Sequence, residues 1–206
     1  MLSRVADALF WMSRYLERAE HLARAVDVTF QLDLDLHGVL ADPLEEEWAG
    51  LLDLLRMPAP DGDGDARAVV PRWILVESRN PGSVLSCVNR SRNNARSIRG
   101  SISPLMWREL NKLHWRLAEP GLQGRVAESP HDFCEETRIG VLLFHGACES
   151  TLTRDEGWHF IQLGRYLERA EKVLRVLDSR AALLDHADAA DLPIATLHWG
   201  AVLRNC

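Results

Sequence analysis

The chain has 206 residues, of which 47% are hydrophobic and 26% are charged, the composition of an ordinary globular protein. Its formal net charge of −6 argues against a nucleic-acid partner bound through overall positive charge. The N-terminal segment is charged, unlike a signal peptide, and no apolar run approaches the ~20 residues of a membrane span. We therefore expect a soluble cytoplasmic protein with no membrane partner.

Helical patterns follow one another along the chain. The first predicted helix covers about residues 3–30 and carries apolar residues at 4-3-4-3 spacing. Residues 69–78 fit either a strand or a helix. Later helix starts are predicted from N-cap residues followed by proline or by a capping box: Asp42-Pro43, Asn80-Pro81, Ser103-Pro104, Ser129-Pro130, and Thr153 with Glu156. The pattern predicts an all-α bundle of about six or seven helices in one domain, 1–206.

Charge is unevenly distributed. Residues 33–65 hold ten acidic residues and one basic residue, whereas residues 90–116 hold seven basic residues and one acidic residue. The basic tract predicts either a solvated helix face or a site for a phosphate or carboxylate.

An internal repeat is the most informative feature of the sequence. RYLERAEHLARAVD at 14–27 aligns without gaps to RYLERAEKVLRVLD at 165–178, with nine of fourteen positions identical. The apolar stripe of the first copy also has a counterpart in the second, so we expect two helices in related environments. The paired stripe positions are Met12 with Leu163, Leu16 with Leu167, Ala19 with Ala170, Ala23 with Leu174, and Val26 with Leu177.

The charged residues of the repeat lie opposite the stripe, and three accounts of them remain open. They form exposed ion pairs worth about 0.2–0.5 kcal/mol each. Alternatively, they form buried pairs between helix layers, where loss of one partner would cost roughly 3–5 kcal/mol. In the third account, the two helices line a cleft for an anionic or zwitterionic ligand.

The sequence shows no self-contained catalytic motif. It contains no H-E-x-x-H, G-x-S-x-G, P-loop or G-x-G-x-x-G pattern. Glu17, Glu20 and His21 lack the spacing of a helical di-metal site, and Lys172 replaces the histidine in the second copy. His145 precedes Cys148 by one helical turn, which fits a buried thiol beside a satisfied histidine better than a nucleophile and its base. We therefore predict no catalytic residue, metal or cofactor in this chain.

Three segments resemble the signature blocks of the alpha-E domain family, a bacterial all-helical family with a repeated Glu-Arg motif. They are MLSRVADALFWMSRYLERAEHLAR, NPGSVLSCVNRSRNNARSIRGSISPLMWRELN and TLTRDEGWHFIQLGRYLERAEKVLRVLD. The resemblance implies a circularly permuted ATP-grasp protein as partner, with a transglutaminase-like protein as a further one. It also implies that ATP and magnesium belong to that partner.

From this resemblance we expect a non-catalytic helical partner of an ATP-grasp system that forms peptide or amino-acid amide bonds. The chain would dock the ligase or position its substrate. The alternative is an enzyme or ligand-binding component whose Arg/Glu helix faces hold a carboxylate or phosphate. The candidate ligand-binding residues are Arg14, Glu17, Arg18, Asn93, Arg96, Arg154, Glu156, Arg165, Glu168 and Arg169.

The last segment, LHWGAVLRNC, carries a helical stripe that reaches Cys206 with no C-cap. The family resemblance implies further helices after this stretch. We therefore expect either a short form or a C-terminally incomplete domain, in which exposed stripe surface favours association, including homo-oligomers.

Overall fold

A computed structural model describes residues 1–36, 44–61, 64–184, 200–201 and 203–204. The described residues contain eight α-helices, one 3-10 turn and no strand, which confirms the predicted all-α fold with slightly more helices than expected. The elements are α1 (Ser3–Leu36), α2 (Leu44–Leu55), α3 (Ala66–Leu75), α4 (Val84–Ser97), η1 (Arg99–Ser101), α5 (Pro104–Leu117), α6 (Pro120–Gly124), α7 (His131–Thr151) and α8 (Glu156–Leu184).

Helix starts are where local prediction and structure differ most. Ser103 caps α5 as predicted, since its hydroxyl accepts a hydrogen bond from the Met106 amide. Asn80 instead forms a turn with the Gly82 amide, and Ser83 caps α4 three residues later. Pro130, rather than Ser129, precedes the first residue of α7. A proline fits several turn positions as well as the first helical turn, so the dipeptide alone does not place the start.

Two further expectations are corrected or refined. Asp155, rather than Thr153, caps α8 by accepting from the Gly157 and Trp158 amides. The ambiguous segment 69–78 lies mostly in helix α3. The predicted start at 42–43 and most of the closing stripe lie outside the described residues.

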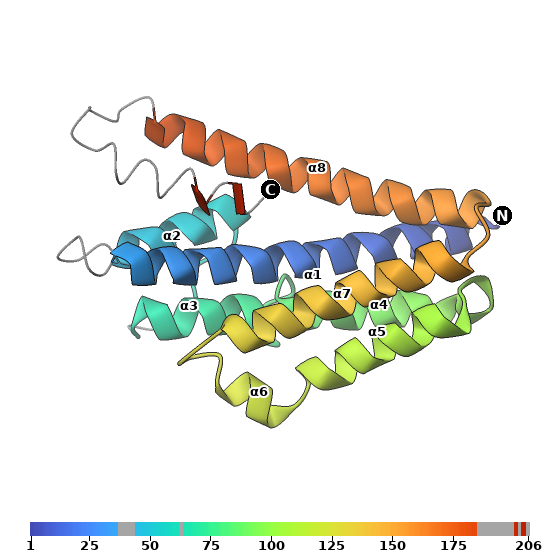
Figure 1. Ribbon diagram of the computed structural model, residues 1–206, viewed down its shortest axis with the longest axis horizontal. Helices are drawn as coiled ribbons and strands as arrows, with labels where there is room; N and C mark the ends of the chain where they lie inside the picture. The colour runs from blue at the N-terminus through green and yellow to red at the C-terminus, as the bar shows by residue number, and fades with distance from the viewer. Residues whose placement is uncertain (37–43, 62–63, 185–199, 202, 205–206) are drawn as a thin grey trace.

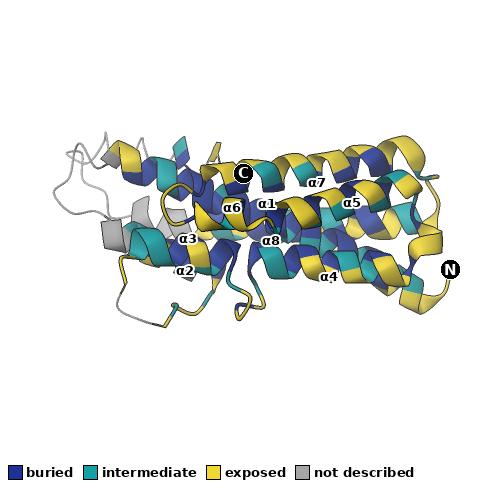
Figure 2. Ribbon diagram, turned by 90° about the horizontal axis from the view of Figure 1, so that it is seen from below, coloured by how far each residue is buried: buried dark blue, intermediate teal, exposed yellow. Residues whose placement is uncertain are grey.

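α1 runs through the middle of the bundle, with α8 on one side and α4, α5 and α7 on the other (Figure 1). The described helices present buried faces inward and exposed faces outward, as amphipathic helices do (Figure 2). None of them is both long and apolar enough to cross a membrane. The whole apolar stripe of α1, from Met12 to Val26, is fully buried.

α8 lies beside α1 and runs in the same direction (Figure 1). The two backbones approach closely at Gly164, where a Cβ atom would collide with the Phe10 carbonyl oxygen. The α8 stripe is exposed, however: Leu163, Leu167, Leu174 and Leu177 are 53%, 48%, 66% and 43% exposed. The expectation of related environments for the two stripes is therefore wrong, because α8 turns its charged face toward α1 and its apolar face toward solvent.

Candidate functional site

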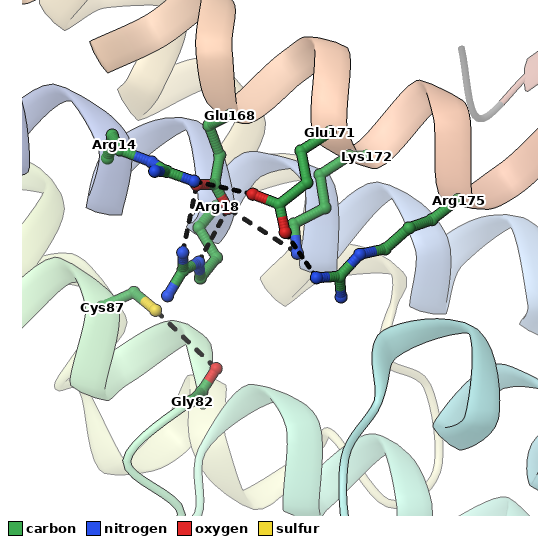
Figure 3. Close-up of polar contacts among 8 residues, drawn as sticks. All are labelled: Arg14, Arg18, Gly82, Cys87, Glu168, Glu171, Lys172 and Arg175. Atoms are coloured by element: carbon green, nitrogen blue, oxygen red, sulfur yellow. Dashed lines mark hydrogen bonds and ion pairs between the residues drawn. The ribbon is translucent and has the colours of Figure 1, made fainter.

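The charged faces of the two repeat copies meet between α1 and α8. The Glu168 carboxylate is fully buried and receives a two-point contact from Arg18, whose Nε and Nη2 donate over 2.7 and 3.0 Å. The Nε of Arg14 donates to the same carboxylate over 2.7 Å, and the Nζ of Lys172 lies 3.7 Å from it (Figure 3). Three cations from two helices therefore surround one buried carboxylate.

The equivalent carboxylate of the first copy is bound in a reciprocal way. Glu17 is 4% exposed and accepts from the Nε of Arg169 over 2.6 Å, while the Nε of Arg165 lies 3.7 Å away. Each Glu-Arg motif thus binds the motif of the other helix. The offset of the repeat maps one contact onto the other, since Arg18–Glu168 corresponds to Arg169–Glu17.

Further Arg–Glu pairs lie beside these contacts in both copies. Arg24 donates to Glu20 within α1, and at the equivalent positions Arg175 donates to Glu171 within α8. Arg14 also binds Glu171 over 2.7 Å. We call these groups the ER layer; it comprises the carboxylates Glu17, Glu20, Glu168 and Glu171 and the cations Arg14, Arg18, Arg24, Arg165, Arg169, Lys172 and Arg175.

The ER layer holds three more positive than negative charges, and the pKa directions follow from burial and from these charges. Burial alone raises the pKa of Glu17 and of Glu168, but their neighbours outweigh it and hold both below their ordinary value: His145 and Arg169 beside Glu17, and chiefly Arg18 beside Glu168. The pKa of His21 falls to about 4, chiefly through burial and then through Lys172 and Arg24. Glu17 and Glu168 are therefore ionised and His21 is neutral near pH 7.

His145 and the cysteines do not form a nucleophilic pair. The Nε2 of His145 faces Glu17 at 3.6 Å, and burial lowers the pKa of the imidazole. Burial raises the pKa of Cys87 and of Cys148 to about 11, so both thiols are protonated near pH 7. The described residues contain no group of three or more His, Cys, Asp or Glu side chains that could hold a metal ion.

The ten candidate ligand-binding residues fall into three places. The six from the repeat, Arg14, Glu17, Arg18, Arg165, Glu168 and Arg169, pair with one another in the ER layer, which is the geometry of the buried-pair account. Asn93 and Arg96 are exposed on α4. Arg154 and Glu156 lie at the start of α8, where the Arg154 guanidinium stacks on Trp158 and Glu156 binds the N-terminal amine over 2.8 Å. The structure thus does not bring all ten into one site.

One surface feature escaped the sequence reasoning, the exposed α8 stripe, which the 4-3-4-3 spacing placed in the core. The basic tract 90–116 was predicted as a solvated helix face or an anion site. On the outer face of α4 and η1, no described carboxylate forms an ion pair with Arg90, Arg92, Arg96 or Arg99. The helix α4, VLSCVNRSRNNARS, itself contains no acidic residue.

Comparison with known proteins gives relatives without an assigned role. An uncharacterized protein of Mycobacterium bovis is 28% identical over 211 residues, and one of Mycobacterium tuberculosis strain H37Rv is 27% identical over the same length. Both matches cover 90% of this chain but only 23% of the relative. No solved structure gives a significant match. A family profile described as a predicted alpha-helical domain with a conserved ER motif matches residues 1–206, and the chain therefore belongs to the Alpha-E family.

Proposed function

We propose that this chain is a non-catalytic docking module of an ATP-grasp ligase system that forms amide bonds on a peptide or amino acid. The observation that carries the proposal is the exposed apolar face of α8, which we call the α8 seam. It consists of Phe160, Leu163, Leu167, Ala170, Leu174 and Leu177.

The spacing of the α8 seam matches the a and d positions of a heptad repeat, with Leu167 and Leu174 at a and Leu163, Ala170 and Leu177 at d. Such a stripe buries its apolar area best against a second helix whose side chains enter the gaps between its own. Soluble proteins rarely leave a continuous apolar stripe of this length without a partner. The seam therefore fits an amphipathic helix.

The ER layer supports the same function by fixing the direction in which the seam points. The charged face of α8 binds α1 through Arg–Glu contacts to the buried carboxylates of Glu168 and Glu17, one of them a two-point contact, so the opposite face is held outward. Buried ion pairs define a single register more effectively than apolar contacts, which tolerate sliding. In this proposal the Glu-Arg motifs orient the docking helix and do not contact the ligase substrate.

The choice of a ligase as the partner rests on the family resemblance and on the length of the relatives. About three quarters of each mycobacterial relative lies outside the matched region, so this domain is one part of a longer protein there. Other domains in one chain with the Alpha-E domain are natural occupants of the seam. The ligase would supply the ATP site, since no phosphate-binding motif is present in this chain.

Co-purification with an ATP-grasp protein encoded beside this chain, followed by an ATP-consumption assay with and without the chain, tests the proposal. We expect a stable complex and altered ATP turnover. The double variant Leu167→Asp/Leu174→Asp should abolish both, because it places two charges in the seam. Leu142→Asp is the matched control, since Leu142 is 69% exposed on α7. Retention of the complex by the seam variant, or its equal loss in the control, would contradict the proposal.

A further inference from the structure

The outer face of α4 and η1 carries a ridge of arginines that no carboxylate among the described residues neutralises. Arg92 and Arg96 share one face of α4 at i and i+4. Arg99 follows in η1, and its guanidinium lies over the same Trp107 ring as that of Arg92. Arg96 and Arg99 are exposed and Arg92 is half-buried. Within the described part of the chain, no carboxylate lies at ion-pair distance from any of the three.

The neighbouring basic residues of α5 differ in this respect. Arg108 and Lys112 lie 3.0 and 3.3 Å from the carboxylate of Glu109, and Arg116 binds both Glu119 and Glu136. The positive charge of the basic tract 90–116 is thus largely compensated on α5 and uncompensated on α4. A negatively charged ligand would therefore have its most favourable electrostatic interaction with the α4 ridge.

Aromatic contacts hold this ridge in place before any ligand binds. The guanidinium of Arg92 lies 5.7 Å from the ring centres of both Trp107 and Trp115, and its Nε donates to Asn111 over 2.7 Å. Arg99 stacks on Trp107 at 5.4 Å. Stacking fixes the plane of a guanidinium and leaves its edge free to donate to a carboxylate, so less side-chain entropy is lost on binding.

A shallow hollow adjoins the ridge on the α5 side. It has a volume of about 550 Å³, and Trp107, Asn111, Lys112 and Trp115 are among its lining residues. Trp115 is 63% exposed, which is unusual for so large an apolar side chain. The ridge therefore combines uncompensated charge with an apolar surface on which the backbone or side chains of a bound chain can lie.

We propose that the ridge of Arg92, Arg96 and Arg99, together with the Trp107–Trp115 hollow, binds an extended acidic peptide segment. Residues i and i+4 of a helix are separated by about 6 Å along its axis. Alternate side chains of an extended peptide are separated by about 6.6 Å and point the same way. Acidic residues two positions apart in such a peptide would meet Arg92 and Arg96, and Arg99 of η1 would bind a further carboxylate beside them.

A peptide fits this surface better than a nucleic acid does. Single-stranded nucleic acids bind basic grooves by stacking bases on free aromatic faces. Here Arg92 and Arg99 both lie over Trp107 and Arg92 also lies over Trp115, so only the rest of the 63% exposed Trp115 ring offers a stacking surface in the hollow. The net charge of −6 would also repel a long polyanion, whereas a short acidic segment contacts only the ridge.

Fluorescence anisotropy tests this inference with a labelled eight-residue peptide of alternating Glu and Ala. Its matched probes are the Gln/Ala peptide and a single-stranded oligonucleotide of equal charge. We expect the acidic peptide to bind in low salt, at least tenfold more tightly than either probe. The Arg96→Gln/Arg99→Gln variant should weaken this binding at least tenfold, because it removes two exposed guanidinium groups without touching the core.

Arg79→Gln/Arg125→Gln is the control variant, since it removes the same charge from other exposed positions and should change the affinity less than threefold. Circular dichroism should show both variants folded, as all four side chains lie on the surface. Equal weakening in the two variants, or tighter binding of the oligonucleotide, would overturn the inference. The measurement uses this chain alone, so its outcome is independent of whether a ligase docks on the α8 seam.

Discussion

Glu168 is the residue on which the α1–α8 contact depends most. Its buried carboxylate compensates Arg14, Arg18 and Lys172 at once, so its neutralisation removes the shared partner of three largely buried cations. Among the described residues, only Arg14 of the three forms a second ion pair, with Glu171. We expect Glu168→Gln to lower the free energy of unfolding by about 3–5 kcal/mol. Urea denaturation monitored by circular dichroism measures this change.

Glu119→Gln is the appropriate control for that experiment. Glu119 also pairs with an arginine, Arg116, but both side chains are about half exposed. Exposed pairs contribute about 0–1 kcal/mol because water and salt screen them. Similar losses for the two variants would show that the carboxylate at 168 is not enclosed as described.

The lowered pKa of His21 predicts how the free energy of unfolding changes with pH. Its pKa is about 4 in the folded protein, against an ordinary 6.5, so the unfolded chain takes up a proton first as the pH falls. The stability due to neutral His21 is complete above pH 6.5 and decreases by about 3 kcal/mol by pH 4. Buried His145, whose pKa is also lowered, contributes in the same direction below pH 6.5. Urea denaturation at pH 7, 5.5 and 4.5 measures this slope.

His21→Gln should flatten that slope between pH 6.5 and pH 4 but leave a further loss at lower pH. That loss belongs to Glu17 and Glu168, whose lowered pKa values give stability above pH 4.5 that disappears as the pH falls through their folded values. An unchanged slope in His21→Gln would show that His21 is not buried neutral.

At the scale of the helix, Gly164 controls how closely α8 approaches α1. A methyl group there would collide with the Phe10 carbonyl oxygen, which belongs to the backbone and cannot rotate away. We expect Gly164→Ala to cost about 1–3 kcal/mol of stability, because the helices must separate. Gly146→Ala on α7 meets no atom within 4 Å and should stabilise the protein by about 0.5–1 kcal/mol. Thermal denaturation of both variants measures the difference, and the same sign for both would contradict this packing.

Individual helices were predictable from sequence to different extents. Apolar spacing predicted α1 and, through the repeat, α8, whereas cap residues followed by proline predicted helices near α5 and α7. The spacing could not tell that the stripe of α8 is exposed, since α1 and α8 carry the same stripe and only the fold decides which face is covered. The charged face of α8 is the one that packs against α1, because the charged face of α1 carries the complementary Arg and Glu side chains.

At the scale of the whole molecule, the repeat singled out the charged residues of the ER layer but left open whether they pair within a helix, between the helices or with a ligand. The identical Glu17-Arg18 and Glu168-Arg169 motifs indicated that the two copies have the same role, and in the structure each motif binds the other across α1 and α8. The α4 ridge arises from tertiary structure instead. Whether its positive charge is compensated depends on which carboxylates of other helices lie nearby. Counting charged residues along the sequence does not show these contacts.

The position of α8 at the edge of the bundle leads to a last prediction, on local opening. α1 packs against several helices, whereas the described contacts of α8 are mainly with α1. A helix held chiefly by one neighbour can detach while the rest stays folded. Native-state hydrogen exchange should therefore report a lower opening free energy for α8 than for α1, α5 and α7.

Leu113→Ala separates this detachment from global unfolding. Leu113 is buried where α5 packs against α7, and its truncation should lower the global free energy of unfolding by about 2–5 kcal/mol. Amides of α5 and α7 that exchange only through global unfolding should then exchange faster by the matching factor, while the exchange of α8 stays unchanged. Glu168→Gln should accelerate exchange in α8 as well, because both kinds of opening break its ion pairs. If Leu113→Ala accelerates α8 and α5 equally, the bundle opens as one unit and α8 does not detach on its own.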